Sequence, residues 1–345
     1  MTPDQVTILN LPELFSEVIS GGESSIIKAG KTMDPAADFA SSATYTLSMN
    51  PKKLGSRFLY DSRGSELFDL ICEQPEYYLT RTEVSLLEEY AEEICKTVGP
   101  VTLVELGSGN SLKTNYILNA FTECHRFARY IPIDISKAAL EQACDNILKQ
   151  HDEVTFTGIN GSYECAFPLI SQINPVMVMF LGSSIGNLDE EEEKIFWGSM
   201  ARCLAAGDYF LLGIDLVKDI ETLEAAYNDR AGVTEAFTKN LFVRMNRELH
   251  SDIDIDCVEH HACYSEERDR IEIAAHFTKQ QVIEIKPTAR SFNIRPNEKI
   301  YTEISRKYRL YEMVPYLSDF GFEASLVLTD PHRRFSLLLL LKVRD

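Results

Sequence analysis

The sequence predicts an α/β fold with a doubly wound, largely parallel sheet and a second, α+β domain inserted late in the chain. Strand-like apolar runs alternate with helix-like segments between residues 101 and 214, the pattern of strand–helix–strand crossovers. The first of these runs ends in a turn with two glycines, Gly107 and Gly109. A helical segment at 310–320 and strands at 323–328 and 335–343 predict a closing antiparallel hairpin.

Composition narrows the class of protein. The chain has 345 residues, 45% of them hydrophobic, and a net charge of −19. We expect one large domain or two that share a sheet, with no nucleic-acid or membrane partner, because so acidic a chain repels anionic surfaces. The eight cysteines are scattered without a Cys-x-x-Cys pair, and the N-terminus lacks a basic and then apolar leader. These features predict a cytoplasmic protein without a disulfide framework.

The elements follow in order along the chain. A helix is predicted at 83–98, where Leu86, Leu87, Tyr90, Ala91 and Ile94 recur at helical spacing. Strands are predicted at 101–106, 129–134, 154–158, 176–182 and 209–214. One long helix or two follow at 220–249, then antiparallel strands within 252–285 and a strand at 300–305.

This order of elements predicts how the domains are arranged. A parallel sheet that ends in an antiparallel hairpin is the architecture of class I methyltransferases. We therefore expect a weakly structured extension at 1–29 and a methyltransferase domain at 82–217 and 308–345. Residues 30–81 and 218–307 are expected to form a substrate-recognition domain that covers the cofactor of the methyltransferase domain.

The turn Gly107-Ser108-Gly109 predicts a nucleoside-binding site. Glycine has no Cβ, so a bulky ligand can lie against the backbone. Asp134 ends the next strand, 25 positions after Gly109, where a carboxylate can bind ribose hydroxyls. The third glycine of the dinucleotide fingerprint and a Gly-Lys-Ser/Thr phosphate loop are both absent. S-adenosylmethionine therefore fits better than a dinucleotide or ATP, and a purely structural turn is the alternative.

Polar residues at other strand ends are candidates for substrate binding. Asn187 follows the fourth strand and could donate to a carboxylate and accept from an amine, or be a plain turn residue. Tyr60, Tyr77 and Tyr227 offer phenols to a flat polar ligand, although partial burial explains a single tyrosine equally well.

Two further patterns have competing interpretations. Glu303 and Ser305 alternate on a strand, so they share a face that is either a ligand site or solvated surface. The group Cys257, His260, His261 and Cys263 matches no common zinc spacing, so no metal site is expected.

Several longer strings carry a family resemblance. They include FLYDSRGSELF at 58–68, PEYYLTRTE at 75–83, VELGSG at 104–109, FLGSSIGNL at 180–188 and LLGIDLVKD at 211–219, and also AYND at 226–229 with GVT at 232–234. From about residue 50 to the C-terminus, the chain resembles the histidine-specific S-adenosylmethionine-dependent methyltransferases. The resemblance implies that S-adenosylmethionine methylates the α-amine of L-histidine three times and gives hercynine, in ergothioneine biosynthesis.

The resemblance also implies roles for individual residues. Asn187 and Tyr227 would hold the substrate carboxylate and amine as the catalytic pair, Tyr60 and Tyr77 would contact the imidazole side, and Glu303 and Ser305 would bind the ring nitrogens. The cofactor site would contain Gly107, Ser108, Gly109, Lys113, Asp134, Ser162, Tyr163 and Gly182.

Two positions depart from the family pattern, since Ser162-Tyr163 replaces Asp-Phe and Ile273 stands where a methionine can line the pocket. Alternative functions are N-methylation of another amino acid, such as a tryptophan derivative, or non-catalytic binding of an adenosine ligand. We expect a monomer whose partner is a small molecule.

Overall fold

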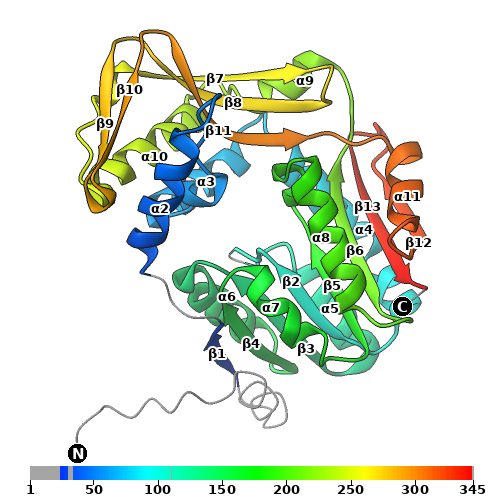
Figure 1. Ribbon diagram of the computed structural model, residues 1–345. Helices are drawn as coiled ribbons and strands as arrows, with labels where there is room; N and C mark the ends of the chain where they lie inside the picture. The colour runs from blue at the N-terminus through cyan, green and yellow to red at the C-terminus, as the bar shows by residue number, and fades with distance from the viewer. Residues whose placement is uncertain (1–23, 30–33, 110, 344–345) are drawn as a thin grey trace, which may run out of the picture.

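The computed structural model describes residues 24–29, 34–109 and 111–343. They form one large sheet with helices on both faces, and a second group of smaller sheets and helices beside it (Figure 1). None of the helices in these ranges is long and apolar enough to cross a membrane.

The large sheet has eight strands in the order β1-β4-β3-β2-β5-β6-β13-β12. Their bounds are β1 Ser25–Lys28, β2 Thr102–Leu106, β3 Ala128–Asp134, β4 Val154–Asn160, β5 Val176–Phe180, β6 Tyr209–Asp215, β12 Phe322–Thr329 and β13 Phe335–Lys342. Strand β13 is antiparallel to both β6 and β12, and the remaining pairs are parallel. The predicted class I methyltransferase sheet, with its closing antiparallel hairpin, is confirmed.

Helices cover both faces of this sheet because its strands are apolar on both sides. In β5, Met177 and Met179 join one core cluster while Val178 and Phe180 join the other, as alternating side chains must. The first cluster packs under α4 Tyr78–Val98, α5 Asn115–His125 and α6 Lys137–Gln150. The second packs under α7 Tyr163–Ile170, α8 Glu190–Cys203 and α11 Leu310–Ser318.

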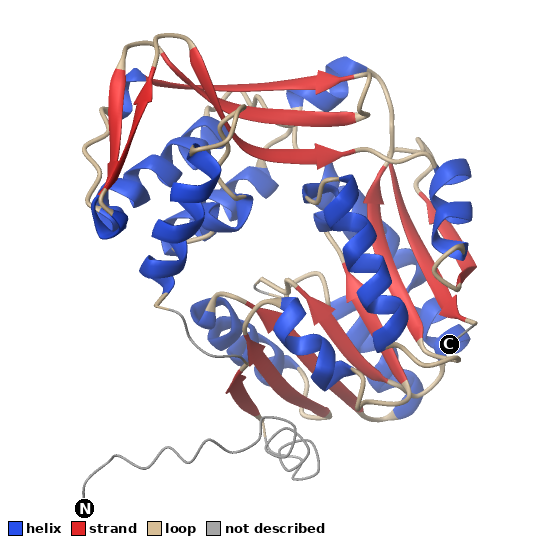
Figure 2. Cartoon of the chain, in the orientation of Figure 1, coloured by secondary structure: helices blue, strands red, loops and turns tan. Residues whose placement is uncertain are grey.

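A second group of elements lies beside the carboxyl ends of the parallel strands (Figure 2). It contains a three-stranded sheet in the order β11-β8-β7 and the hairpin β9-β10. The strands are β7 Val258–Ser265, β8 Arg270–Phe277, β9 Gln281–Ile285, β10 Arg290–Ile294 and β11 Glu298–Arg306, and the helices are α2 Pro35–Leu47, α3 Ser62–Glu73, α9 Ile220–Ala225 and α10 Val233–Leu249. The antiparallel strands within 252–285 and the strand at 300–305 are thereby confirmed.

The second group has its own hydrophobic core, made by residues from 39–79 and 223–300. This core brings together the two segments that we assigned to a substrate-recognition domain. It supports that division of the chain, whose boundaries stay a prediction.

The structure corrects the prediction in three places. Residues 25–28 form β1, which pairs in parallel with β4, so this part of the expected weakly structured extension belongs to the sheet; residues 1–23 lie outside the described ranges. Helix α4 begins at Tyr78 and not at 83. Helices α2 and α3 were not predicted.

Candidate active site

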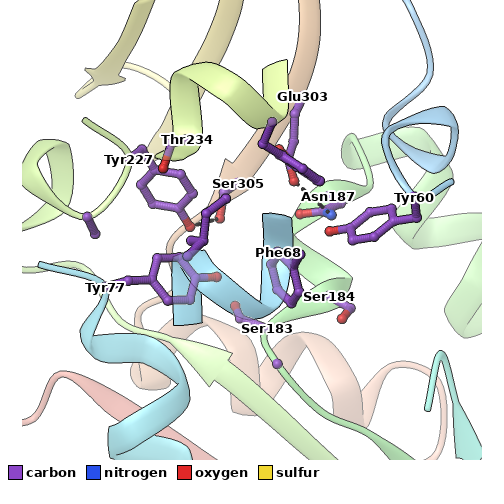
Figure 3. A pocket seen from close by; sticks show the side chains of 14 residues that line it. Tyr60, Phe68, Tyr77, Ser183, Ser184, Asn187, Tyr227, Thr234, Glu303 and Ser305 are labelled. Carbon is purple, nitrogen blue, oxygen red and sulfur yellow. Dashed lines mark hydrogen bonds between the residues drawn. The ribbon is translucent and has the colours of Figure 1, made fainter. Parts of the chain in front are cut away.

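A pocket opens where the carboxyl ends of the parallel strands meet the second group of elements (Figure 3). The residues that line it are Tyr60, Phe68, Ile71, Tyr77, Gly182, Ser183, Ser184, Asn187, Ala226, Tyr227, Thr234, Phe237, Glu303 and Ser305. Every residue predicted to bind substrate is in this set except Ile273. Segments separated by more than two hundred positions in the sequence thus converge on one cavity.

The loop after β5 brings Asn187 to the pocket. Gly182 and Ser183 both have positive φ, 76° and 56°, which turns the chain sharply into a short 3₁₀ helix at Ser184–Asn187. A Cβ at Gly186 would lie 2.9 Å from the carbonyl oxygen of Arg306, so only glycine allows this loop to pack so tightly on β11. The close approach sets Asn187 beside Glu303.

Glu303 and Asn187 form the first polar pair of the pocket. Asn187 Nδ2 donates to Glu303 Oε1 over 3.2 Å, across two elements that are 116 positions apart in sequence (Figure 3). Burial raises the pKa of Glu303 to about 7, although the charge of Lys307 and the hydrogen bond from Asn187 oppose the shift. A carboxylate with that pKa can accept a hydrogen bond from a ligand N–H at neutral pH.

Tyr227 and Ser305 form the second polar pair. Their hydroxyl oxygens lie 2.7 Å apart, and both side chains are buried. Burial raises the pKa of Tyr227 despite the opposing charge of Lys307, so the phenol keeps its proton at neutral pH. Glu303 and Ser305 share one face of β11, as their alternation predicts, and that face lines a pocket and is not solvated surface.

Aromatic rings make the rest of the wall. The ring of Tyr77 lies edge-on to Tyr227 with centroids 6.1 Å apart, and Tyr60 packs edge-on against Phe237 at 5.4 Å. Burial, with smaller contributions from neighbouring acidic groups, raises the pKa of both Tyr60 and Tyr77 well above the ordinary value. These rings are uncharged at neutral pH, and their faces can pack against a planar ligand ring.

A buried ionic network behind this wall was not predicted. Lys307 is fully buried and lies 2.9 Å from Asp215 Oδ2, while Lys218 lies 2.6 Å from Asp215 Oδ1. Lys307 also donates to Tyr227 Oη over 2.9 Å and to Ser305 Oγ over 2.7 Å. The signal was present in the sequence, since Lys307 continues the alternation of Glu303 and Ser305.

The glycine turn lies where the prediction put it, at the carboxyl end of β2. Gly107 and Gly109 have φ of 68° and 52°, and a Cβ at either would meet no atom within 4 Å, so the turn faces open space. Asp134 Oδ2 accepts from the Gly109 N–H over 2.9 Å, and Oδ1 accepts from the Ser136 N–H over 2.8 Å. Ser108 Oγ is buried without a hydrogen-bond partner among the described residues. An open cradle with an unpaired hydroxyl and a carboxylate fits an adenosine ligand.

Lys113 connects this turn to the substrate pocket. Its ammonium lies 2.5 Å from Glu83 Oε2, and Glu83 Oε1 accepts from the Gly182 N–H over 2.6 Å. Glu83 is fully buried on the apolar face of α4, beside Leu79, Leu86 and Leu87. An acidic residue among the buried apolar positions of a helix indicates a buried polar contact, and we did not use this signal in the sequence analysis.

The two departures from the family pattern lie in different surroundings. Ser162 precedes α7, in a turn where the Gly161 N–H donates to the Asp134 carbonyl over 3.0 Å, so it is next to the strand end that carries Asp134. The ring of Tyr163 packs edge-on against Phe180 at 5.7 Å. Ile273 is paired with Glu303 across the sheet but is only 2% exposed and is not one of the lining residues, which corrects the expectation that it lines the pocket.

His260 serves the fold of the site. Its Nε2 lies 2.8 Å from the Tyr227 carbonyl oxygen and its Nδ1 lies 2.9 Å from Thr238 Oγ1.

Within the ranges that the structure describes, no three His, Cys, Asp or Glu side chains are placed to hold a metal ion.

Comparison with known families decides which class of protein carries this site. The family model described as histidine-specific, SAM-dependent methyltransferase matches residues 39–342. The chain belongs to this family. It is therefore a methyltransferase, and the fold and the glycine turn agree with that assignment.

Curated relatives of this methyltransferase match over most of its length. It is 37% identical to the histidine N-alpha-methyltransferase of Mycolicibacterium smegmatis over 293 residues, which cover 85% of this chain and 91% of the relative. The enzyme of the same name from Mycobacterium tuberculosis is 34% identical, with coverage of 86% and 92%. Ergothioneine biosynthesis protein 1 of Schizosaccharomyces pombe is 30% identical and matches 74% of this chain but 34% of its own length.

Proposed function

We propose that this methyltransferase transfers three methyl groups from S-adenosylmethionine to the α-amine of L-histidine and so produces hercynine for ergothioneine biosynthesis. The observation that carries the proposal is the placement of Glu303 and Ser305 beside Asn187 and Tyr227 in one pocket. Glu303 and Ser305 suit the two imidazole nitrogens, whereas Asn187 and Tyr227 suit the amino-acid end. The names of the relatives point to the same substrate.

The cofactor is proposed to lie on the glycine turn. Gly107, Ser108 and Gly109 would face the adenosine and Asp134 would accept from its ribose hydroxyls, because two backbone N–H groups leave the carboxylate with further lone pairs. Lys113 would meet the carboxylate of the cofactor's methionine part, and Gly182 would line the junction with the substrate. Ser162 and Tyr163 would flank the adenine. When bound, S-adenosylmethionine supplies an electrophilic methyl group on a sulfonium.

The protein's own part in the reaction is to align the amine, exclude water and remove protons. The substrate ammonium must lose one proton before each of the three transfers, and the trimethylated product has none left to lose. Because burial keeps Tyr227 protonated, its hydroxyl can relay a proton but cannot hold one as a lasting base. Tyr60 and Tyr77 would lie on either side of the imidazole ring. Because each transfer adds a methyl group to the amine, the pocket must have room beside Asn187 for a larger group after each step.

The protein is proposed to act as a monomer on a small-molecule substrate. The net charge of −19 is consistent with a cationic cofactor and gives no support to a nucleic-acid partner. A cytoplasmic location is part of the same proposal.

Turnover of an amino-acid panel tests the proposed substrate. Purified protein with S-adenosylmethionine should methylate L-histidine with a kcat/KM above that for tryptophan, phenylalanine and tyrosine. Phenylalanine leaves the half-buried Glu303 carboxylate without a donor. Tryptophan and tyrosine each offer one polar group where imidazole offers a donor and an acceptor, so each competitor should lose at least about 100-fold in kcat/KM. A higher kcat/KM for tryptophan, or no turnover of any amino acid, would contradict the proposal.

A further inference from the structure

Lys307 lies behind the pocket wall and does not line the pocket. Its side chain is fully buried, and each of its three possible hydrogen bonds is made: to Asp215 Oδ2 at 2.9 Å, to Tyr227 Oη at 2.9 Å and to Ser305 Oγ at 2.7 Å. Burial opposes its charge, but Asp215 and Tyr227 outweigh that effect and raise the pKa of Lys307. It is therefore a fixed ammonium group with no N–H to spare.

The ammonium determines the direction of the hydrogen bonds in front of it. Lysine has donors and no acceptor, so both hydroxyl oxygens must accept from it. Tyr227 Oη and Ser305 Oγ are also within 2.7 Å of each other, so one of them donates its proton to the other. One hydroxyl proton of the two remains, and it belongs to an oxygen that already accepts two hydrogen bonds. With both of its lone pairs in use, this oxygen can only donate. The other oxygen keeps a single lone pair, and the adjacent ammonium makes it a poor acceptor.

Glu303 presents the opposite polarity on the same face of β11. Its carboxylate accepts from Asn187 Nδ2 and has remaining lone pairs for a ligand N–H. The pocket thus offers an acceptor at Glu303 and a donor at the Tyr227–Ser305 pair, two residues further along the strand. A neutral imidazole has one N–H and one lone-pair nitrogen, whereas imidazolium has two N–H groups and pyrrole has no lone-pair nitrogen.

We propose that Lys307 is a positioning residue that makes the Tyr227–Ser305 pair a donor and thereby selects the neutral imidazole ring of the substrate. The proposal rests on histidine being the substrate. Lys307 acts only through the two hydroxyls. One of them belongs to Tyr227, the proposed proton relay, so the ratio of two substrates reports on the ring and the absolute rate does not. Without Lys307, each hydroxyl oxygen regains a lone pair, so either one could accept a hydrogen bond from the ligand as readily as donate one.

Lys218 provides a matched control. It is a second lysine on the Asp215 carboxylate, with 8% of its side chain exposed, and it donates to Tyr78 Oη over 2.6 Å. Its ammonium donates to Tyr78, Asp215 and the Leu216 carbonyl oxygen, and not to the two pocket hydroxyls. Replacing it removes a buried cation from the same network and leaves the polarity of the wall intact.

The test compares L-histidine with the two isomers of pyrrolylalanine, which keep one ring N–H at either position and lack the accepting nitrogen. Wild-type protein should prefer histidine over the better isomer by at least about 30-fold in kcat/KM, because the pyrrole leaves a buried donor unpaired. In Lys307→Met the preference should fall below about fivefold, whereas Lys218→Met should keep the wild-type ratio even if its absolute rates drop.

The ratio separates a specific role from damage to the fold. If Lys307→Met slows both substrates by the same factor, or if wild type methylates histidine without preferring it over pyrrolylalanine, the inference about Lys307 is wrong while the proposed function stands. If wild type does not methylate histidine at all, the proposed function itself fails. In the single variant Lys307→Met, Asp215 keeps Lys218 as its partner. If that variant does not fold, the double variant Lys307→Met/Asp215→Asn removes the buried carboxylate as well. It must show the same loss of preference.

Discussion

The unusual pKa of Glu303 predicts that replacing it stabilises the protein while damaging its activity. Burial raises the pKa of Glu303 to about 7 from an ordinary value of 4.5, so the folded state holds a proton that the unfolded chain has released. Stability is therefore lost as the pH rises from about 4.5 to about 7, and the ionised carboxylate destabilises the fold at higher pH. Glu303→Gln removes the charge and keeps an oxygen that can accept from Asn187.

The size of the effect follows from the two pKa values. A difference of about 2.5 corresponds to about 3.4 kcal/mol. Water in the pocket reaches the half-buried carboxylate and reduces this amount, so we expect Glu303→Gln to be more stable than wild type by about 1–2 kcal/mol at pH 8. The gain should shrink towards zero as the pH is lowered to about 5, where wild-type Glu303 is protonated in the folded state.

Urea unfolding followed by circular dichroism at pH 5 and pH 8 measures the difference. Glu272→Gln is the control, because Glu272 lies on the neighbouring strand in an ion pair with Arg270 at 2.5 Å and should give no gain at pH 8. The same Glu303→Gln protein should lose at least about tenfold in kcat/KM for histidine, equivalent to about 1.4 kcal/mol. A variant that is less stable than wild type at pH 8, or whose stability difference does not change with pH, would show that ionised Glu303 does not destabilise the fold.

Two further predictions concern the cofactor site. Asp134→Ala should weaken binding of S-adenosylmethionine and S-adenosylhomocysteine alike, by about 10- to 100-fold, because it removes charge-assisted hydrogen bonds worth about 1.5–3 kcal/mol; unchanged affinity by calorimetry would show that the ribose lies elsewhere. Glu83→Gln should raise the KM for S-adenosylmethionine by about tenfold with a smaller effect on the KM for histidine, because Lys113 loses the carboxylate that holds it. An equal rise in both KM values would indicate that Glu83 supports the fold in general and not the cofactor side.

The sequence predicted those parts of the fold in which local pattern and tertiary environment agree. The apolar run at 176–180 is a buried central strand, and its alternate side chains pack into two different cores. By contrast, β1 is four residues long and gains its place only by pairing with β4, more than a hundred positions away. Helix α3 contains Gly64, where a Cβ would lie 1.8 Å from the Leu59 carbonyl oxygen, so packing requires a residue that by itself disfavours a helix.

The site shows the same division between local and distant information. Glu303 and Ser305 were found because a strand places alternate residues on one face. Lys307 follows the same alternation but lies just beyond β11, where a lysine is expected to reach solvent. Its partner Asp215 is brought close by pairing between the segments that follow β6 and β11, including the bridge from Leu216 to Tyr308. No local sequence pattern predicts the contact between Lys307 and Asp215, which are far apart in the sequence.

The location and number of the transferred methyl groups show whether this enzyme trimethylates the α-amine of histidine. Purified protein should be incubated with L-histidine and excess S-adenosylmethionine, and the product should be fragmented in a mass spectrometer. Because Asn187 and Tyr227 address the amino-acid end while Glu303 and Ser305 bind the ring, we predict three methyl groups, all on the α-amine. Methyl groups on the imidazole ring, or a reaction that stops after one transfer while cofactor remains, would contradict the account.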